Sequence, residues 1–244
     1  MKTLVTIIVA IITFSLFTQP SGYVCTGSYL TFTLDDGYLD HYTEAFPLFK
    51  NYNFPATAYI PSGLVGKVFE NNTLMDWWQI EDIKRAGWEI GSHGIYHENL
   101  TVLEPEDIEK IILQSKKDFI ESGILAETLA IPYGRYNSAV KELAKKHFIA
   151  VRPSEWGYNS LKNLDKYSLK SLWVTNTTTV DEMKGWVTEG NKAGTWTILM
   201  IHFVRDDKSD EYTITPVDLE NLLSYVKSEK VEVRTVAEVV KECG

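Results

Sequence analysis

Several patterns that mark specialised protein classes are missing from this 244-residue chain. It holds only two cysteines, Cys25 and Cys243, and their wide spacing excludes a cysteine-based zinc site, which needs closely set pairs. With 15 Gly and 8 Pro, it is neither collagen-like nor of low complexity. The net charge is −9 and no cluster of Lys or Arg interrupts this acidity, which argues against nucleic acid and anionic membranes as partners. A hydrophobic content of 44% is typical of a globular protein and excludes a disordered chain.

The most extended apolar stretch is short and lies at the N-terminus. Lys2 precedes it, residues 4–17 form it, and residues 19–22 (Gln-Pro-Ser-Gly) follow it. A stable membrane span needs about 20 apolar residues, so the pattern favours a secretory signal peptide. We therefore expect a signal peptide, or alternatively an uncleaved N-terminal anchor, over residues 1–24. The protein would be secreted or at the cell surface, with membrane contact only through an uncleaved segment.

Short apolar stretches typical of strands alternate with helical patterns through the rest of the chain. The expected strands cover residues 29–34, 56–60, 88–90, 128–131, 148–151, 169–174 and 196–201. Four expected helices cover residues 39–50, 78–86, 105–121 and 138–147. Two more begin at residues 180 and 216, and a last helix ends near residue 241. About seven β/α units without a linker predict one domain over residues 25–244, an incomplete α/β barrel with parallel strands. An open doubly wound sheet is the alternative, and in both architectures active residues lie beyond the carboxyl ends of the strands.

If the chain is exported, the two cysteines could form a disulfide, because disulfides persist in oxidising compartments. Cys25 stands just ahead of the first expected strand, and Cys243 is the penultimate residue. Because the chain ends meet in a closed barrel, a disulfide between them is sterically feasible. Two free thiols are the alternative.

Polar residues collect where the expected strands end. Asp35-Asp36-Gly37 follows the first strand, and the glycine permits a sharp exit that lets both carboxylates converge. Two carboxylates so close repel each other unless a cation offsets their charge. A solvated helix N-cap is the alternative interpretation of this motif.

Two histidines, His93 and His97, follow the third expected strand. Histidines four residues apart share one face if the segment is helical, which suits two imidazoles that ligate one metal. Two surface histidines are the alternative. His41 and His147 lie within helical patterns and are interpreted as structural.

Two more strand ends carry turn-forming or polar residues. Residues 132–135 (Pro-Tyr-Gly-Arg) predict a tight turn whose backbone N–H groups could face a site. His202 closes an apolar strand, either as a satisfied core residue or as a general acid in a dry pocket. Together the clusters supply one carboxylate and two imidazoles for a metal, with a spare carboxylate and a spare histidine. Such a set favours metal-assisted hydrolysis over non-haem iron oxygenation.

In this order, the motifs resemble those of the polysaccharide deacetylases of carbohydrate esterase family 4. The resemblance runs from about Tyr29 to Val239. Its four motifs are Leu34-Asp35-Asp36-Gly37, His93-Gly94-Ile95-Tyr96-His97, Pro132-Tyr133-Gly134 and Met200-Ile201-His202. Leu34 and Met200 stand where Phe and Leu are usual in the family.

The resemblance implies a distorted (β/α)7 barrel and a division of roles among the matched residues. Asp36, His93 and His97 would bind a divalent metal, typically Zn²⁺, with Co²⁺, Mn²⁺ or Ni²⁺ as alternatives. Asp35 would act as the catalytic base and His202 as the catalytic acid.

The resemblance also implies how the substrate is held. The backbone N–H of Tyr133, between Pro132 and Gly134, would hold the oxyanion. Trp156 and Arg135 are candidate substrate contacts.

Three positions depart from the family pattern. Many members place an Arg that orients the base two residues before the third-motif Pro, where this chain has Ala130. The fourth family motif, an Asp/Trp element, has its nearest counterpart in Ser154-Glu155-Trp156, and Phe203 stands where Asp is frequent. The departures affect the tuning of base and acid and leave the metal ligands intact.

The resulting hypothesis is an exported monomeric hydrolase that cleaves carbon–nitrogen bonds other than peptide bonds. It would remove N-acetyl groups, or secondarily O-acetyl groups, from an N-acetylated carbohydrate polymer or oligosaccharide. One alternative is a glycan-binding relative that keeps the fold and the metal but turns over little. Another is a deacylase of a small non-sugar amide on the same fold.

Overall fold

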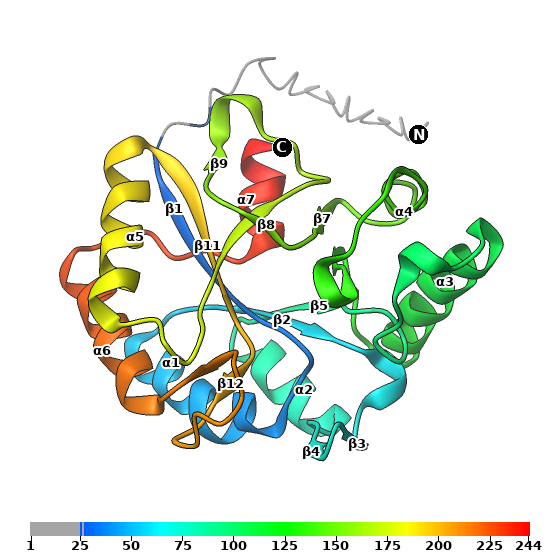
Figure 1. Ribbon diagram of the computed structural model, residues 1–244, viewed down its shortest axis with the longest axis horizontal. Coiled ribbons are helices and arrows are strands. Elements are labelled where there is room, and N and C mark those ends of the chain that lie inside the picture. The colour runs from blue at the N-terminus through cyan, green and yellow to red at the C-terminus, as the bar shows by residue number, and fades with distance from the viewer. Residues whose placement is uncertain (1–24, 26) are drawn as a thin grey trace, which may run out of the picture.

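A sheet of parallel strands curls into a nearly closed barrel with helices around it (Figure 1). The computed structural model describes residue 25 and residues 27–244, so the expected signal peptide lies outside the described residues. The strand order is β7-β6-β5-β2-β1-β11-β10-β8. The bounds are β1 (Tyr29–Leu34), β2 (Thr57–Ile60), β5 (Glu89–Ser92), β6 (Thr128–Ala130), β7 (Ala150–Arg152), β8 (Glu155–Trp156), β10 (Lys170–Trp173) and β11 (Thr195–Ile201). The expected parallel barrel is confirmed, and the open doubly wound sheet is excluded.

The barrel closes between its two edge strands through irregular chain. The N–H of Val151 in β7 donates to the carbonyl of Lys166 (2.8 Å), and the N–H of Leu169 donates to the carbonyl of Val151 (3.0 Å). The short β9 (Asn159–Ser160) pairs antiparallel with β11. The connection over residues 153–169 therefore completes the wall where no regular strand pairing exists.

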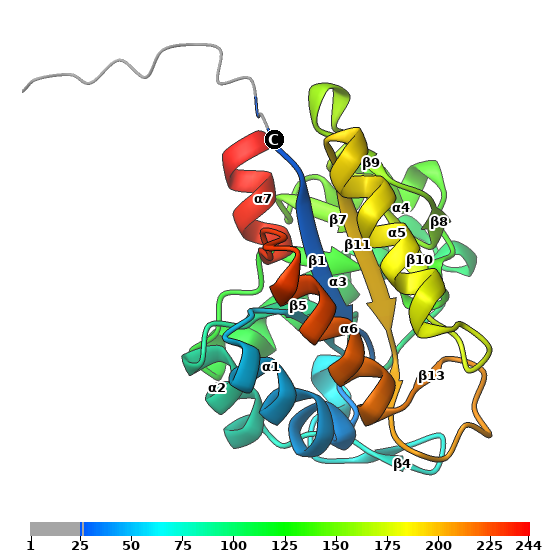
Figure 2. The same ribbon diagram turned by 90° about the vertical axis from the view of Figure 1, so that its left-hand side faces the viewer.

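Helices cover the outside of the barrel, with α6 between α1 and α5, and α5 packs against β1 and β11 (Figure 2). The helices are α1 (Phe46–Tyr52), α2 (Trp77–Arg85), α3 (Pro105–Glu121), α4 (Ser138–Ala144), α5 (Val180–Ala193), α6 (Pro216–Ser228) and α7 (Val236–Cys243). The expected bounds of α3 are confirmed, with Pro105 in the first turn where its missing N–H costs nothing. Among the described helices, none is both long and apolar enough to cross a membrane.

The helix expected over residues 39–50 is confirmed, and the first half of it is π-helical in place of α-helical. The chain forms a π-helical turn over His41–Ala45 and only then α1. Pro47 lies in the first turn of α1 and has no N–H to donate to the Thr43 carbonyl, so a continuous α-helix cannot pass through it. Two short strand pairs lie outside the main sheet. They are β3 (Val68–Phe69) with β4 (Asn72–Thr73), and β12 (Phe203–Val204) with β13 (Thr213–Ile214).

Helix α7 covers the amino ends of the strands. The N–H of Val236 donates to the Thr57 hydroxyl at the start of β2 (3.0 Å), and the N–H of Ala237 donates to Glu89 Oε2 at the start of β5 (2.8 Å). Burial raises the pKa of Glu89 above its ordinary value. With the amino end sealed in this way, the carboxyl end is left for the functional site.

A disulfide joins Cys25 and Cys243, so of the two alternatives the bridge is confirmed. Their Cα atoms lie 5.3 Å apart, although the residues are 218 positions apart in sequence. The bridge ties the end of α7 to the chain that enters β1.

Replacing both cysteines with serine is expected to lower the free energy of unfolding by about 2–4 kcal/mol, because the link restricts the unfolded chain. Urea unfolding with and without reductant measures this loss, and acetate release at 25 °C should stay near wild type. Equal midpoints for the oxidised and reduced wild-type protein would contradict the expectation.

Candidate metal and catalytic site

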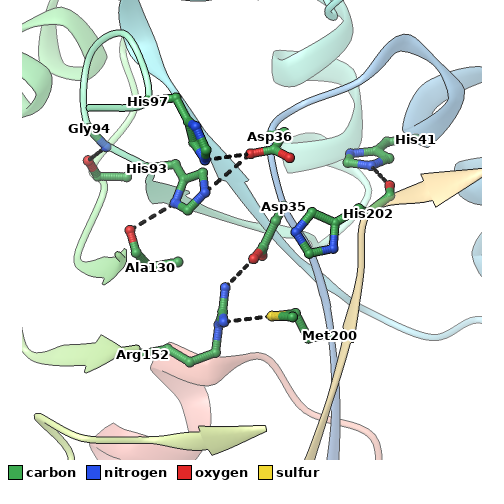
Figure 3. A network of polar contacts seen from close by, with 11 residues as sticks. Asp35, Asp36, His41, His93, Gly94, His97, Ala130, Arg152, Met200 and His202 are labelled. Atoms are coloured by element: carbon green, nitrogen blue, oxygen red, sulfur yellow. Dashed lines mark hydrogen bonds and ion pairs between the residues drawn. The ribbon is translucent and has the colours of Figure 1, made fainter. Parts of the chain in front are cut away.

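A cavity of about 360 Å³ lies at the carboxyl ends of the strands. Asp35 and Asp36 reach it from the end of β1, His93 and His97 from the segment after β5, and His202 from the end of β11. Residues that are far apart in the sequence thus meet at one edge of the barrel (Figure 3).

Both aspartates face the cavity because the backbone turns sharply after β1. Asp36 has φ 74° and Gly37 has φ 71°, and this left-handed conformation is uncommon for any residue but glycine. At position 37 a Cβ would also lie 3.0 Å from Ile60 Cδ1. The turn places adjacent carboxylates on the same side, which a regular strand cannot do.

The two histidines converge through a loop, and the helical spacing considered for them is wrong. Gly94 (φ 76°) and His97 (φ 60°) are left-handed, and the N–H groups of Ile95 and Tyr96 donate to Glu98 Oε2 at 3.2 and 3.0 Å. This compact turn brings His97 back beside His93, with ring centroids 4.9 Å apart.

Asp36 Oδ1 lies 3.3 Å from the Nε2 atoms of both His93 and His97. His93 Nδ1 donates to the carbonyl of Ala130 (2.8 Å), so its Nε2 carries the lone pair that faces Asp36. All three ligand atoms lie within 4.8 Å of one another. Within residues 25 and 27–244, the buried Asp36 Oδ1 has no hydrogen-bond partner. Two imidazoles, one carboxylate and an unsatisfied buried oxygen fit a divalent cation with an open coordination position.

The charges at the site also suit a cation. Burial alone would raise the pKa of Asp36, but the His93 imidazole 3.3 Å away and the other nearby imidazoles outweigh burial and hold this pKa well below its usual range. Burial and the neighbouring His93 lower the pKa of His97 to about 4, so its ring is neutral at pH 7 and can donate a lone pair.

Asp35 is held by an arginine that the sequence reasoning missed. Arg152 Nη2 donates to Asp35 Oδ2, and Nη1 lies 3.0 Å from the sulfur of Met200. Asp35 and Arg152 are only 2% and 1% exposed, so this ion pair is buried. Arg152 ends β7 directly beyond the apolar residues 149–151, and the strand-end rule applied to the other clusters would have found it.

His202 stands between β11 and β12, and its ring lies 5.0 Å from that of Tyr212. Tyr133 has φ 58°, and its ring lies 4.3 Å from that of His97. Gly134 and Arg135 also line the cavity.

Comparisons with known proteins agree with this geometry. The model of the polysaccharide deacetylase family matches residues 25–151, just over half of the chain. This chain belongs to the polysaccharide deacetylase family. YxkH of Bacillus subtilis, which carries the polysaccharide deacetylase name, is 32% identical over 115 residues (47% of this chain and 40% of YxkH). The Helicobacter pylori peptidoglycan deacetylase is 30% identical over 103 residues (41% and 32%).

The matched regions span well under half the length of each of these two relatives. Among solved structures, this chain is similar to a family 4 acetyl xylan esterase from Clostridium thermocellum in complex with a cobalt ion. The match covers 87% of this chain and 90% of the esterase chain. The TM-score is 0.61 at 19% identity, which shows a common fold.

The arginine that pairs with Asp35 lies one strand away from the position that the resemblance implies. Ala130 in β6 and Arg152 in β7 are direct partners in the sheet register, so an arginine at either position can enter the same part of the barrel. Arg135, the nearby alternative, places its guanidinium 5.9 Å from the Tyr133 ring.

Two tryptophans lie at or beside the cavity, and Trp156 stays a candidate substrate contact. Trp173 of β10 lines the cavity, whereas Trp156 is half-exposed and contacts the edges of Trp173 and Trp186, with ring centroids 5.5 and 5.3 Å away. Pro132 is buried beside the cavity-lining Tyr133.

Proposed function

We propose that this protein removes acetyl groups from a carbohydrate in a metal-dependent hydrolysis, with N-acetyl groups as the main target and O-acetyl groups as the second. One observation carries the proposal: a buried Asp36–His93–His97 ligand set shares a cavity with the ion-paired Asp35 and with His202.

Asp36, His93 and His97 would hold the ion, with Zn²⁺ as the first candidate and Co²⁺, Mn²⁺ or Ni²⁺ as alternatives. A divalent cation at this position polarises an acyl oxygen and lowers the pKa of water. The Ala130 carbonyl accepts a hydrogen bond from His93 Nδ1 and so orients the ring for metal binding through Nε2.

The remaining groups would divide the proton transfers and the charge stabilisation. Asp35, oriented by Arg152, takes the proton of the attacking water. The backbone N–H of Tyr133, which has a left-handed conformation, would stabilise the negative charge that develops on the acyl oxygen. His202 then protonates the departing amine, which cannot leave as an anion. A dedicated proton donor is needed most for an amide, which favours N-acetyl substrates.

The place of action follows from the same set of observations. The Cys25–Cys243 disulfide is stable in an oxidising compartment, and the Helicobacter pylori relative is named for peptidoglycan. We propose action outside the cytoplasm, after export through residues 1–24, as a monomer on an N-acetylated glycan.

Acetate release from N-acetylated chito-oligosaccharides and peptidoglycan fragments tests the proposal. Acetate should appear with the purified protein, disappear with a chelator, and return when Zn²⁺ is added. A glycan-binding relative would instead bind the oligosaccharides without releasing acetate. Release from small acetamides alone would favour the non-sugar amidase, and activity that a chelator leaves unchanged would overturn the metal-dependent mechanism.

A further inference from the structure

Three contacts join the segment after β1 to the segment after β11. The rings of Tyr38 and Phe203 stack with centroids 4.1 Å apart. Asp40 Oδ2 accepts a hydrogen bond from Arg205 Nε (2.9 Å) and forms an ion pair with Nη2 of the same guanidinium (2.8 Å). Between these contacts, His41 Nε2 bonds the backbone carbonyl of His202 (Figure 3). The first segment carries Asp35 and Asp36 and the second carries His202, so these contacts set how the two halves of the site face each other.

His41 is a fully buried imidazole for which the proposed chemistry has no use. It begins the π-helical turn ahead of α1, with a side chain that is 0% exposed. Because a carbonyl can only accept, Nε2 must carry the proton and donate it to His202. Burial lowers the pKa of His41, which keeps the ring neutral. Its Nδ1 then has no proton, and it has no partner among the described residues.

The His202 carbonyl needs such a donor because of where it lies. Strand β11 ends at Ile201 and β12 begins at Phe203, so His202 occupies the break between the two ladders. Its neighbours keep their backbone partners: Asp35 N–H donates to Ile201 O (2.9 Å), and Phe203 N–H donates to Tyr212 O (3.0 Å). A carbonyl left unpaired there would rotate toward another donor, and the side chain on the same residue would move with it.

We propose that His41 is a positioning residue for His202, which holds the backbone of the catalytic acid so that the imidazole points at the leaving group. This inference rests on the proposed function. A misplacement of about 1 Å lowers a rate by about 10²-fold, so the loss of this one hydrogen bond should be visible in turnover.

The test compares two variants on two substrates. His41→Phe fills the space without a donor, whereas His41→Gln places an amide N–H near the position of Nε2. The substrates are an N-acetylated chito-oligosaccharide, whose amine must be protonated, and an aryl acetate, whose phenolate leaves without a proton. For His41→Phe we expect kcat on the amide substrate to fall by about 30- to 100-fold, with KM and bound zinc unchanged. The rate of aryl acetate hydrolysis should stay within about threefold of the wild-type rate, because this reaction needs no proton donor. His41→Gln should recover most of the amide activity.

Controls separate positioning from general damage. His147→Phe alters a histidine away from the cavity, paired with Glu109 at 3.4 Å, and should leave both activities unchanged. In a His202→Ala background, His41→Phe should cause no further loss, because the group it positions is gone. If His41→Phe does not fold, His41→Met is a more flexible variant that also lacks the donor.

Equal losses on both substrates, or losses that add to that of His202→Ala, would show a structural role and overturn this inference alone. A wild-type protein that releases no acetate from the amide would overturn the proposed function, and the inference with it.

Discussion

Replacing His97 with alanine is expected to abolish acetate release and zinc binding together. The variant keeps one imidazole and one carboxylate of the three-ligand set. The hydrogen bonds from the Ile95 and Tyr96 N–H groups to Glu98, which hold the turn, are left in place. A cation at the site contributes several kcal/mol of transition-state stabilisation, so the loss should be about 10³-fold or more. Elemental analysis of the purified variant and an acetate assay measure the two effects.

A readout that does not depend on turnover completes this experiment. Zinc that binds the folded state raises the melting temperature of the wild-type protein by mass action, and it should not raise that of His97→Ala. His147→Ala is the matched control and should behave like wild type in all three measurements. Full activity of His97→Ala in protein shown to be free of metal would refute the assignment of the site.

Replacing Arg152 with methionine is expected to have the second largest effect. Arg152 is the only arginine within the described residues that contacts Asp35, and both side chains are buried. Without it, two adjacent carboxylates lose their counter-charge and Asp35 loses its orientation. Breaking a buried ion pair in this way should destabilise the fold by about 3–5 kcal/mol, and kcat should fall by about 10²-fold or more. Urea unfolding and acetate release measure the two losses.

The sheet register supplies a rescue for the same experiment. Because Ala130 and Arg152 are partners in adjacent strands, Ala130→Arg in the Arg152→Met background returns a guanidinium to the same part of the barrel. We expect this double variant to regain at least tenfold in kcat over Arg152→Met. Arg152→Lys keeps the charge but lacks the planar fork, so it should fall between Arg152→Met and wild type. An Arg152→Met protein with wild-type kcat would exclude a positioning role for Arg152.

The strand-end rule explains why much of the site could be predicted. The carboxyl ends of parallel strands share one edge, so Asp35, Asp36, His93 and His202 could be assigned to one place from the strand pattern alone. The same rule applies to Arg152, which directly follows the expected strand over residues 148–151, but the rule was not applied to this strand end. His41 shows the opposite case. It lies in a helical pattern, and only the packing of two distant segments reveals its bond to the His202 carbonyl.

The sequence by itself determined the alternation of strands and helices, the order of the motifs and the residue types at each strand end. These features depend on local backbone preference and on hydrophobic periodicity, which neighbouring residues carry. Only the tertiary structure decided between disulfide and free thiols, replaced the helix by a left-handed loop at His97, and selected Arg152 as the partner of Asp35. The disulfide and the Asp35–Arg152 pair depend on how the barrel closes, because they join residues 218 and 117 positions apart, and no local pattern encodes the distance between them.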